Sequence, residues 1–208
     1  MDFMKDIPDG YYGLCICDPP YGINYDTDRT YPKKDRSAEY NQKQRTPKHT
    51  SKNWDSKPAI EYWQELRRVS KNQIVFGGNY FTENLKPTNS WIFWDKIISS
   101  DSIFSVGELI WTSFSCTMDK ITMSQFEGTN GGKNRIHPTE KPVALYRKLL
   151  LKFAKAGQRM LDTHGGSFSS AVACHMEGYE MDICEIDKEY FDAGVKRFKE
   201  ATCQLKMF

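Results

Sequence analysis

Short apolar, partly β-branched runs alternate with longer stretches of helical periodicity along this chain of 208 residues. Runs of four to seven such residues are typical of buried strands, whereas apolar residues three and four apart predict a helix. Alternating strands and helices pack best as a mostly parallel sheet with helices on both faces. We therefore predict a doubly wound α/β sheet in a single domain spanning residues 1–208. The predicted strands are 12–17, 73–76, 90–96, 108–114, 159–162 and 179–184, and the predicted helices are 58–69, 143–154, 188–199 and one running through Ala171 and Cys174.

The first predicted strand ends at an acid, two prolines and an aromatic residue, Asp18-Pro19-Pro20-Tyr21. Proline cannot donate to a sheet ladder, so the strand stops there, at the sheet edge where α/β proteins bind ligands. Asp18 and the carbonyl of Pro19 can each accept one N–H of an exocyclic amine, and Tyr21 offers a flat face for stacking. This pattern suits direct attack of that amine on an electrophilic methyl group. The alternative is a strand end followed by an aromatic turn, with Asp18 capping a helix.

A glycine turn follows a later strand, in the segment Asp162-Thr163-His164-Gly165-Gly166-Ser167. A strand, a glycine turn and a helix bring backbone N–H groups close to a ligand. About twenty residues after this turn the next strand ends at Glu185 and Asp187, an offset suited to binding ribose hydroxyls. The alternative role for Glu185 is to cap the helix predicted from Lys188.

The composition is that of an ordinary globular protein, with a net charge of +2. No run approaches the roughly 20 apolar residues of a membrane helix, and Met1–Asp6 does not resemble a secretory signal, so we expect a cytoplasmic protein without membrane contact. Cys15 and Cys17 fall on one face of a strand, where we expect them to pack as small hydrophobic residues. The six cysteines form no C-x-x-C pair, so we expect no metal site.

Two segments differ from the rest. Residues 24–57 carry nine Lys or Arg against five acids and no Leu, Ile or Val, so they cannot build a core. We expect a mobile basic arm that meets phosphates beside the site, the alternative being a solvated insertion. Residues 114–136 are predicted to be irregular, either as a short target-recognition segment or as a connector.

Lys141, at the start of a helix where it opposes the macrodipole, is a candidate carboxylate ligand or a solvated lysine.

Taken together, the number and order of these motifs resemble the S-adenosylmethionine-dependent amino-DNA methyltransferases, the N-4/N-6 DNA methylase family. The similarity is to the permuted type, in which the catalytic motif precedes the cofactor motif. It covers most of the chain and rests on these segments: Met4–Asp9, Asp18–Tyr21, Gly77–Phe81, Trp94–Lys96, Trp111–Phe114, His137–Val143 and Asp162–Ser169. An initial Asp in the catalytic motif is the form typical of adenine-N6 enzymes, whereas cytosine-N4 enzymes usually begin it with Ser.

The resemblance implies a seven-stranded, Rossmann-like methyltransferase sheet and transfer of a methyl group from S-adenosylmethionine to adenine N6 in DNA. Asp18, Pro19, Pro20 and Tyr21 would form the catalytic motif, with Tyr21 stacking on a flipped base. The implied cofactor-binding residues are Thr139, Lys141, Asp162, His164, Gly165, Gly166, Ser167, Glu185 and Asp187. DNA is the implied partner, and members of the family often form homodimers and serve restriction–modification. Cytosine-N4 or RNA-amine methylation, and a DNA-binding relic without turnover, are the alternatives.

The chain also departs from the family pattern. Thr163 and His164 replace a Pro-Phe pair, and Phe168 replaces the last glycine, where its bulk is expected to crowd the cofactor. The strand that usually precedes the catalytic lead-in is absent from the sequence, so the sheet is expected to lack one strand at the N-terminus. No large target-recognition domain is present, so specificity is expected to come from the two segments described above or from a partner.

Overall fold

The computed structural model describes residues 2–23, 55–101, 105–128 and 135–204. They form a seven-stranded sheet in the order β5-β3-β4-β2-β1-β6-β7. The strands are β1 (Tyr12–Cys17), β2 (Ser70–Phe76), β3 (Trp91–Asp95), β4 (Gly107–Thr112), β5 (Asp119–Thr122), β6 (Met160–Asp162) and β7 (Met181–Ile183). β4 pairs antiparallel with both β2 and β3, and the other pairs are parallel, so the sheet is mixed and mostly parallel as predicted.

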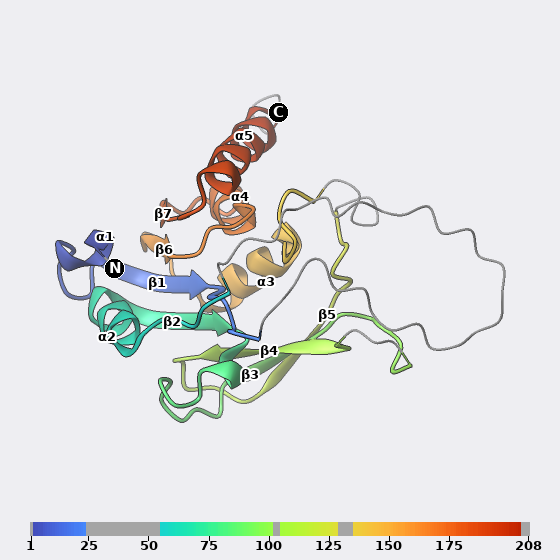
Figure 1. Ribbon diagram of the computed structural model, residues 1–208, viewed down its shortest axis with the longest axis horizontal. Helices are drawn as coiled ribbons and strands as arrows, with labels where there is room; N and C mark the ends of the chain where they lie inside the picture. The colour runs from blue at the N-terminus through green and yellow to red at the C-terminus, as the bar shows by residue number, and fades with distance from the viewer. Residues whose placement is uncertain (1, 24–54, 102–104, 129–134, 205–208) are drawn as a thin grey trace.

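Helices cover both faces of this sheet (Figure 1). They are α1 (Asp2–Lys5), α2 (Ile60–Val69), α3 (Val143–Phe153), α4 (Ser169–Met176) and α5 (Lys188–Gln204), with a short 3₁₀ turn at Gly78–Tyr80. α2 buries Trp63 and Leu66 against one face, whereas α3 buries Leu145 and Leu149 against the other. No helix in the part of the chain described here is long and apolar enough to cross a membrane.

β1 lies inside the sheet, between β2 and β6, and its side chains alternate between the two faces. Leu14 and Ile16 join the core under α3, whereas Cys15 and Cys17 join the core under α2. All six residues of the strand are buried, as expected for a strand that is paired on both edges and covered on both faces. The prediction that Cys15 and Cys17 share a face and pack as small hydrophobic residues is confirmed.

One prediction about the sheet needs correction. Residues 119–122, within the segment expected to be irregular, form the edge strand β5, parallel to β3. The segment is short and polar outside Ile121, so its pairing depends on the exposed edge of β3 and not on its own pattern. The described residues contain no strand before β1, and β5 is the strand that brings their number to seven.

The order of the strands creates a topological switch point between β1 and β6. The chain moves from β1 to β2 on one side, whereas it moves from β6 to β7 on the other. A crevice opens at the carboxyl ends of two neighbouring parallel strands where such connections diverge. Asp18 follows β1 directly and Asp162 ends β6, so the two predicted motifs meet at this point.

Candidate active site

A cavity of about 860 Å³ occupies this crevice. Its lining includes the predicted catalytic segment Asp18–Tyr21, the glycine segment His164–Ser167 and the acids Glu185 and Asp187. Thr139 and Lys141, from the segment before α3, complete the set of predicted residues that line it. Asp162 is the exception, because it is 1% exposed and lies behind the lining. A single cavity therefore brings together two motifs that lie far apart in the sequence.

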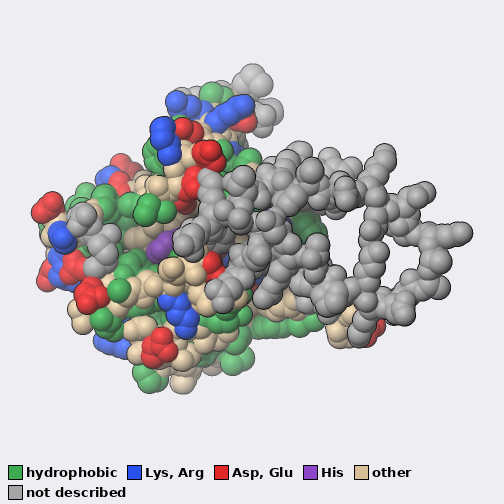
Figure 2. Space-filling view, in the orientation of Figure 1, with side chains coloured by type: hydrophobic (Ala, Val, Ile, Leu, Met, Phe, Trp, Pro, Cys, Tyr) green, Lys and Arg blue, Asp and Glu red, His purple; other side chains and the backbone are tan. Residues whose placement is uncertain are grey.

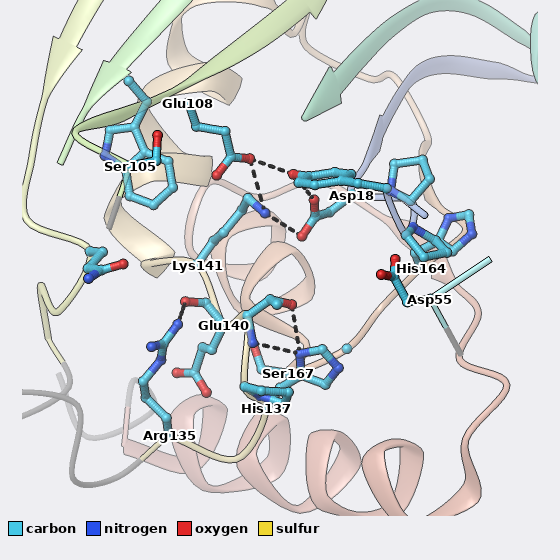
Figure 3. A pocket seen from close by; sticks show the side chains of 18 of the residues that line it. Asp18, Asp55, Ser105, Glu108, Arg135, His137, Glu140, Lys141, His164 and Ser167 are labelled. Atoms are coloured by element: carbon cyan, nitrogen blue, oxygen red, sulfur yellow. Dashed lines mark hydrogen bonds and ion pairs between the residues drawn. The ribbon is translucent and has the colours of Figure 1, made fainter. Parts of the chain in front are cut away.

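Beside Asp18 the site holds a compact cluster of charges (Figure 3). The Lys141 ammonium lies between two carboxylates: it pairs with Asp18 Oδ2, and its Nζ is 3.3 Å from Glu108 Oε1. Lys96 Nζ is 3.1 Å from the other oxygen of Glu108. The Tyr21 hydroxyl lies 2.8 Å from Asp18 Oδ1 and 2.7 Å from Glu108 Oε1. Two cations thus balance two carboxylates around one phenol.

Burial and pairing act in opposite directions on this cluster. Burial raises the pKa of Asp18 above its usual range, although Lys141 opposes the shift. Burial would raise the pKa of Glu108 too, but Lys141 and Lys96 outweigh it and lower that pKa. Burial would lower the pKa of Lys141, but Asp18 and Glu108 hold it above its usual value. Lys141 is therefore a buried ammonium, and its predicted contact with a cofactor carboxylate stays a prediction.

The ring of Tyr21 is held by other aromatic side chains. One face stacks on Tyr80, with ring centroids 4.7 Å apart and planes 14° from parallel, and Phe81 packs against its edge. Gly77 makes room for the ring, because a Cβ there would lie 2.4 Å from it. A base could therefore stack only on the face of the Tyr21 ring opposite Tyr80. This stacking, which the resemblance implies, stays a prediction.

The glycine turn and Glu185, which are predicted to bind the cofactor, line one part of the cavity. The Gly165 N–H donates to the carbonyl of Cys184, and a Cβ at Gly165 would meet the side chain of Ile183 at 2.8 Å. Glu185 accepts the Gly166 N–H at 2.7 Å and the Asp187 N–H at 2.8 Å. Each carboxylate oxygen of Glu185 can accept a further hydrogen bond. The alternative role of Glu185 as a helix cap is filled by Asp187, which accepts the N–H groups of Glu189 and Tyr190 at the start of α5.

The expectation that Phe168 crowds the cofactor is wrong. Phe168 has a φ of 60° and a ψ of 23°, the left-handed conformation that the family's glycine would adopt easily. Its side chain is 3% exposed and points away from the cavity, onto Gly194 and Phe191 of α5. The substitution therefore adds a buried contact between α4 and α5 and adds nothing to the cavity wall.

Asp162 and His164 are tied to the glycine turn from behind. Asp162 accepts the Ser170 hydroxyl at 2.6 Å and the His164 N–H at 2.9 Å, yet burial still raises its pKa to about 7. Burial lowers the pKa of His164 to about 4, so its imidazole is neutral at pH 7. Its Nδ1 lies 2.9 Å from the Thr163 hydroxyl, and its ring contacts Tyr62 edge-on.

The remaining predicted residues are held by short local contacts. The Thr139 hydroxyl lies 3.1 Å from His137 Nδ1, and the Ser167 hydroxyl lies 3.1 Å from that of Ser169. Arg197 of α5 donates to the Ser167 carbonyl at 2.7 Å and lies 3.1 Å from the buried Glu140 carboxylate. Arg197 thus fastens the glycine turn to the segment that carries Thr139 and Lys141.

Sequence reasoning missed Glu108, Lys96 and Tyr80 as site residues. Glu108 is the second residue of β4, which runs antiparallel to β2. The start of β4 therefore lies beside the carboxyl end of β2, and the sequence pattern does not reveal this strand direction. A weak signal was present, because an acid begins an otherwise apolar strand and a lysine follows Trp94-Asp95. Tyr80 follows the glycine pair, and only the fold places its ring on Tyr21.

Comparison with known proteins finds similarity in sequence and in fold. Over 66 residues the chain is 33% identical to DNA adenine methyltransferase YhdJ of Escherichia coli K12, a match that covers 32% of this chain and 22% of that protein. The solved structure of M1.HpyAVI bound to S-adenosylmethionine has a TM-score of 0.56 at 15% identity, covering 94% of this chain and 91% of that one. PvuII DNA methyltransferase, which is cytosine-N4-specific, has a TM-score of 0.58 at 13% identity, covering 96% and 86%.

At these identities the two solved structures establish a common fold only. The family itself follows from the sequence match to a model of N6 and N4 DNA methylases, which extends over residues 81–196. This range runs from the turn after β2, through β4 and the glycine turn, into α5. Because the match covers more than half of the chain, this protein belongs to the DNA methylase family of the N6/N4 type.

Proposed function

We propose that this protein transfers a methyl group from S-adenosylmethionine to the exocyclic N6 amine of a flipped-out adenine in DNA. The observation that carries the proposal is the shared cavity, which is lined both by Asp18–Tyr21 and by the glycine turn with Glu185. A methyl donor and a base amine must meet in one place for direct displacement, so the two motifs have to face the same space. The family match and the likeness to a DNA adenine methyltransferase support this assignment.

The donor set of the cavity fits S-adenosylmethionine. Glu185 keeps lone pairs for ribose hydroxyls, and the exposed side chain of Ile186, beside it in the lining, offers an apolar surface for an adenine ring. The absence of a Cβ at Gly165 lets the side chain of Ile183 pack against the backbone of the turn. When bound, this cofactor supplies an electrophilic methyl group. The volume of about 860 Å³ lies within the range of small-molecule sites.

On the opposite side of the cavity, the chain's own residues handle the target amine. Asp18 accepts one N–H and the Pro19 carbonyl accepts the other, which directs the nitrogen lone pair toward the methyl group. Lys141 and Tyr21 fix the orientation of the Asp18 carboxylate before the base arrives. Such preorganisation removes a rotational cost from the reacting geometry.

The choice of adenine over cytosine rests on two observations. The catalytic motif begins with Asp, and the relative aligned over 66 residues is named an adenine methyltransferase. Cytosine-N4 transfer is the second candidate, because the fold is equally similar to that of a cytosine-N4-specific enzyme. Both bases present an exocyclic amine, so the geometry of Asp18 and Pro19 serves either.

The test is methyl transfer from labelled S-adenosylmethionine to unmethylated duplex DNA, followed by digestion to nucleosides and identification of the labelled one. We expect label in N6-methyladenine and its loss in Asp18→Ala, by at least about 10²-fold, because the amine loses its acceptor. Asp9→Ala is the matched control, since Asp9 is an exposed carboxylate paired with Arg68. Label in N4-methylcytosine would replace the substrate assignment. Folded protein that binds cofactor in calorimetry but transfers no label to DNA or RNA would refute the enzymatic proposal.

A further inference from the structure

The Tyr21 hydroxyl has one proton and two carboxylate neighbours at hydrogen-bond distance. Its oxygen lies 2.8 Å from Asp18 Oδ1 and 2.7 Å from Glu108 Oε1. A phenol donates one hydrogen bond and accepts others, so it can donate to only one of these carboxylates at a time. Three oxygens, of Asp18, Tyr21 and Glu108, therefore lie in a row. The phenol proton makes one of the two hydrogen bonds between them, and a second proton is needed to make the other.

Methylation of an amine produces such a proton. The N–C bond forms as the C–S bond of the donor breaks, and the bonding pair stays on sulfur. The nitrogen gains positive charge as the N–C bond forms, and it loses one N–H proton in the same step. Asp18 is the acceptor of an N–H in the proposed function, so it is the first group to receive that proton.

We propose that Glu108 is a positioning residue that completes a proton path from the target amine through Asp18 and Tyr21. Once the base is bound, Tyr21 donates to Glu108 and leaves Asp18 Oδ1 available to the amine. As the N–C bond forms, the amine proton moves to Asp18, the Asp18 proton moves to the Tyr21 oxygen, and the Tyr21 proton moves to Glu108. Glu108 then releases this proton to water in the cavity that it lines, and the Tyr21 hydroxyl rotates from Asp18 back to Glu108, which restores the starting state. This inference rests on the proposed function.

The surroundings of Glu108 favour release of the proton. Lys96 Nζ lies 3.1 Å from Oε2, and Lys141 Nζ lies 3.3 Å from Oε1, so two cations stabilise the carboxylate. They lower the pKa of Glu108, whereas the pKa of Asp18 is raised by burial. Burial and the two carboxylates raise the pKa of Tyr21 far above neutrality, so the phenol passes a proton on and does not hold a negative charge. The low pKa of Glu108 means that it holds the proton only in passing and releases it readily to water.

The groups that face this chain come from separate elements. Asp18 follows β1, Lys96 follows β3, Glu108 lies on β4 and Lys141 precedes α3. The rings of Trp94 and Phe76 cover the ammonium groups of Lys96 and Lys141 respectively. The two lysines and the two carboxylates have a net charge of zero. While the proton is on the path, the net charge of this cluster is +1.

The experiment measures single-turnover methyl transfer from pH 6 to pH 9 for the wild type, Glu108→Gln, Tyr21→Phe and the double variant. The amide introduced by Glu108→Gln fills the space but cannot take the proton, and Tyr21→Phe keeps the ring but breaks the chain of oxygens. Near pH 7 we expect each single variant to be slower by about 10²-fold, the scale of general acid–base contributions. The double variant should be no slower than either single one, because both changes interrupt one path. The deficit should shrink as the pH rises, since hydroxide can then collect the proton directly.

The control is Glu180→Gln, which removes a carboxylate from an exposed pair with Arg159. Cofactor affinity, measured by calorimetry, should stay within about twofold in all variants, because no residue of the path belongs to the Glu185 side of the cavity. Tyr21→Phe keeps every charge, so it still tests the path if Glu108→Gln does not fold. A deficit that does not change with pH, or variants within about threefold of the wild type, would overturn the proton path. A wild type without methyl transfer would instead remove the proposed function on which the path rests.

Discussion

Two buried carboxyl groups, at the carboxyl ends of β1 and β6, show how the pKa of a buried acid depends on its hydrogen-bond and ion-pair partners. Asp18 has an ammonium, Lys141, and a phenol as partners, whereas Asp162 has only a hydroxyl and a backbone N–H. Hydrogen bonds from neutral groups offset burial less than a cation does. Asp162 accordingly has its pKa raised to about 7, while its position behind the glycine turn is fixed by Ser170 and His164.

This shift predicts a pH dependence of folding stability. A carboxyl group whose folded-state pKa is raised stabilises the fold below its unfolded pKa, and this contribution is lost as the pH rises toward the folded value. For Asp162 the window runs from the ordinary value of 3.8 to about 7. Asp162→Asn cannot ionise, so its free energy of unfolding relative to the wild type should rise across this window by about 1.4 kcal/mol per pH unit.

The measurement is urea unfolding of both proteins at several pH values, with only the difference between them interpreted. Other acids, such as Asp182 beside Arg159, have lowered pKa values and cancel in that difference. A difference that stays constant from pH 4 to pH 7 would contradict the assignment to Asp162.

At the scale of elements, the contact between α4 and α5 supports the glycine turn. Phe168 enters α4 in a left-handed conformation and places its ring where α5 has a glycine, Gly194. From α5, Arg197 reaches the carbonyl of Ser167 and the carboxylate of Glu140. The part of the cavity that the glycine turn lines is therefore shaped by a helix that contributes little to the lining itself.

This contact predicts that Gly194→Ala changes the stability of the protein in opposite directions with and without the Phe168 ring. Alanine is favoured over glycine inside a helix by about 1 kcal/mol, so Gly194→Ala would normally stabilise α5. Here the new Cβ would lie 2.4 Å from the Phe168 ring, so we expect destabilisation by about 1–3 kcal/mol. In the background of Phe168→Ala, where the ring is gone, the same Gly194→Ala change should be stabilising. Thermal unfolding of the four proteins measures both effects, and equal effects in the two backgrounds would show that the ring is not the obstacle.

At the level of the whole molecule, charge is distributed unevenly along the sequence, whereas both signs are mixed on the face of the described residues that Figure 2 shows. Acidic and basic side chains are interspersed on the visible coloured surface (Figure 2). The excess of basic residues lies in the predicted arm, residues 24–57, which holds nine Lys or Arg against five acids. Residues 24–54 of this arm lie outside the described part of the chain, and its role in binding phosphates stays a prediction.

That role predicts the salt dependence of DNA binding. Each lost phosphate contact should lower the slope of log affinity against log salt by about 0.9. Replacing Lys33, Lys34 and Arg36 with Ala should therefore weaken binding and flatten the slope, as measured by fluorescence anisotropy at several salt concentrations. The triple change of Lys188, Lys196 and Lys199 to Ala in α5 removes the same charge elsewhere. Equal effects of the two triple variants would argue against a specific role for the arm.

Local patterns in the sequence are enough to predict the fold class, most of the strands and helices, and the two motifs. A buried run such as Tyr12–Cys17 is apolar whatever surrounds it, and prolines end it without help from tertiary structure. The same local chemistry made Asp18 and the glycine turn recognisable as candidates. The parallel neighbours of β1 then placed both motifs at one edge of the sheet.

Only the tertiary structure decided which side chains complete the site. The direction of β4, the seating of β5 beside β3 and the stacking of Tyr80 on Tyr21 depend on pairing between segments that are distant in the chain. Phe168 shows the same limit, since its position in the motif suggested a blocked cavity and its rotamer placed the ring against α5. Glu108 joins Asp18 and Lys141 for a physical reason: burial makes an unpaired charge costly, so the fold brings opposite charges together wherever they lie in the sequence.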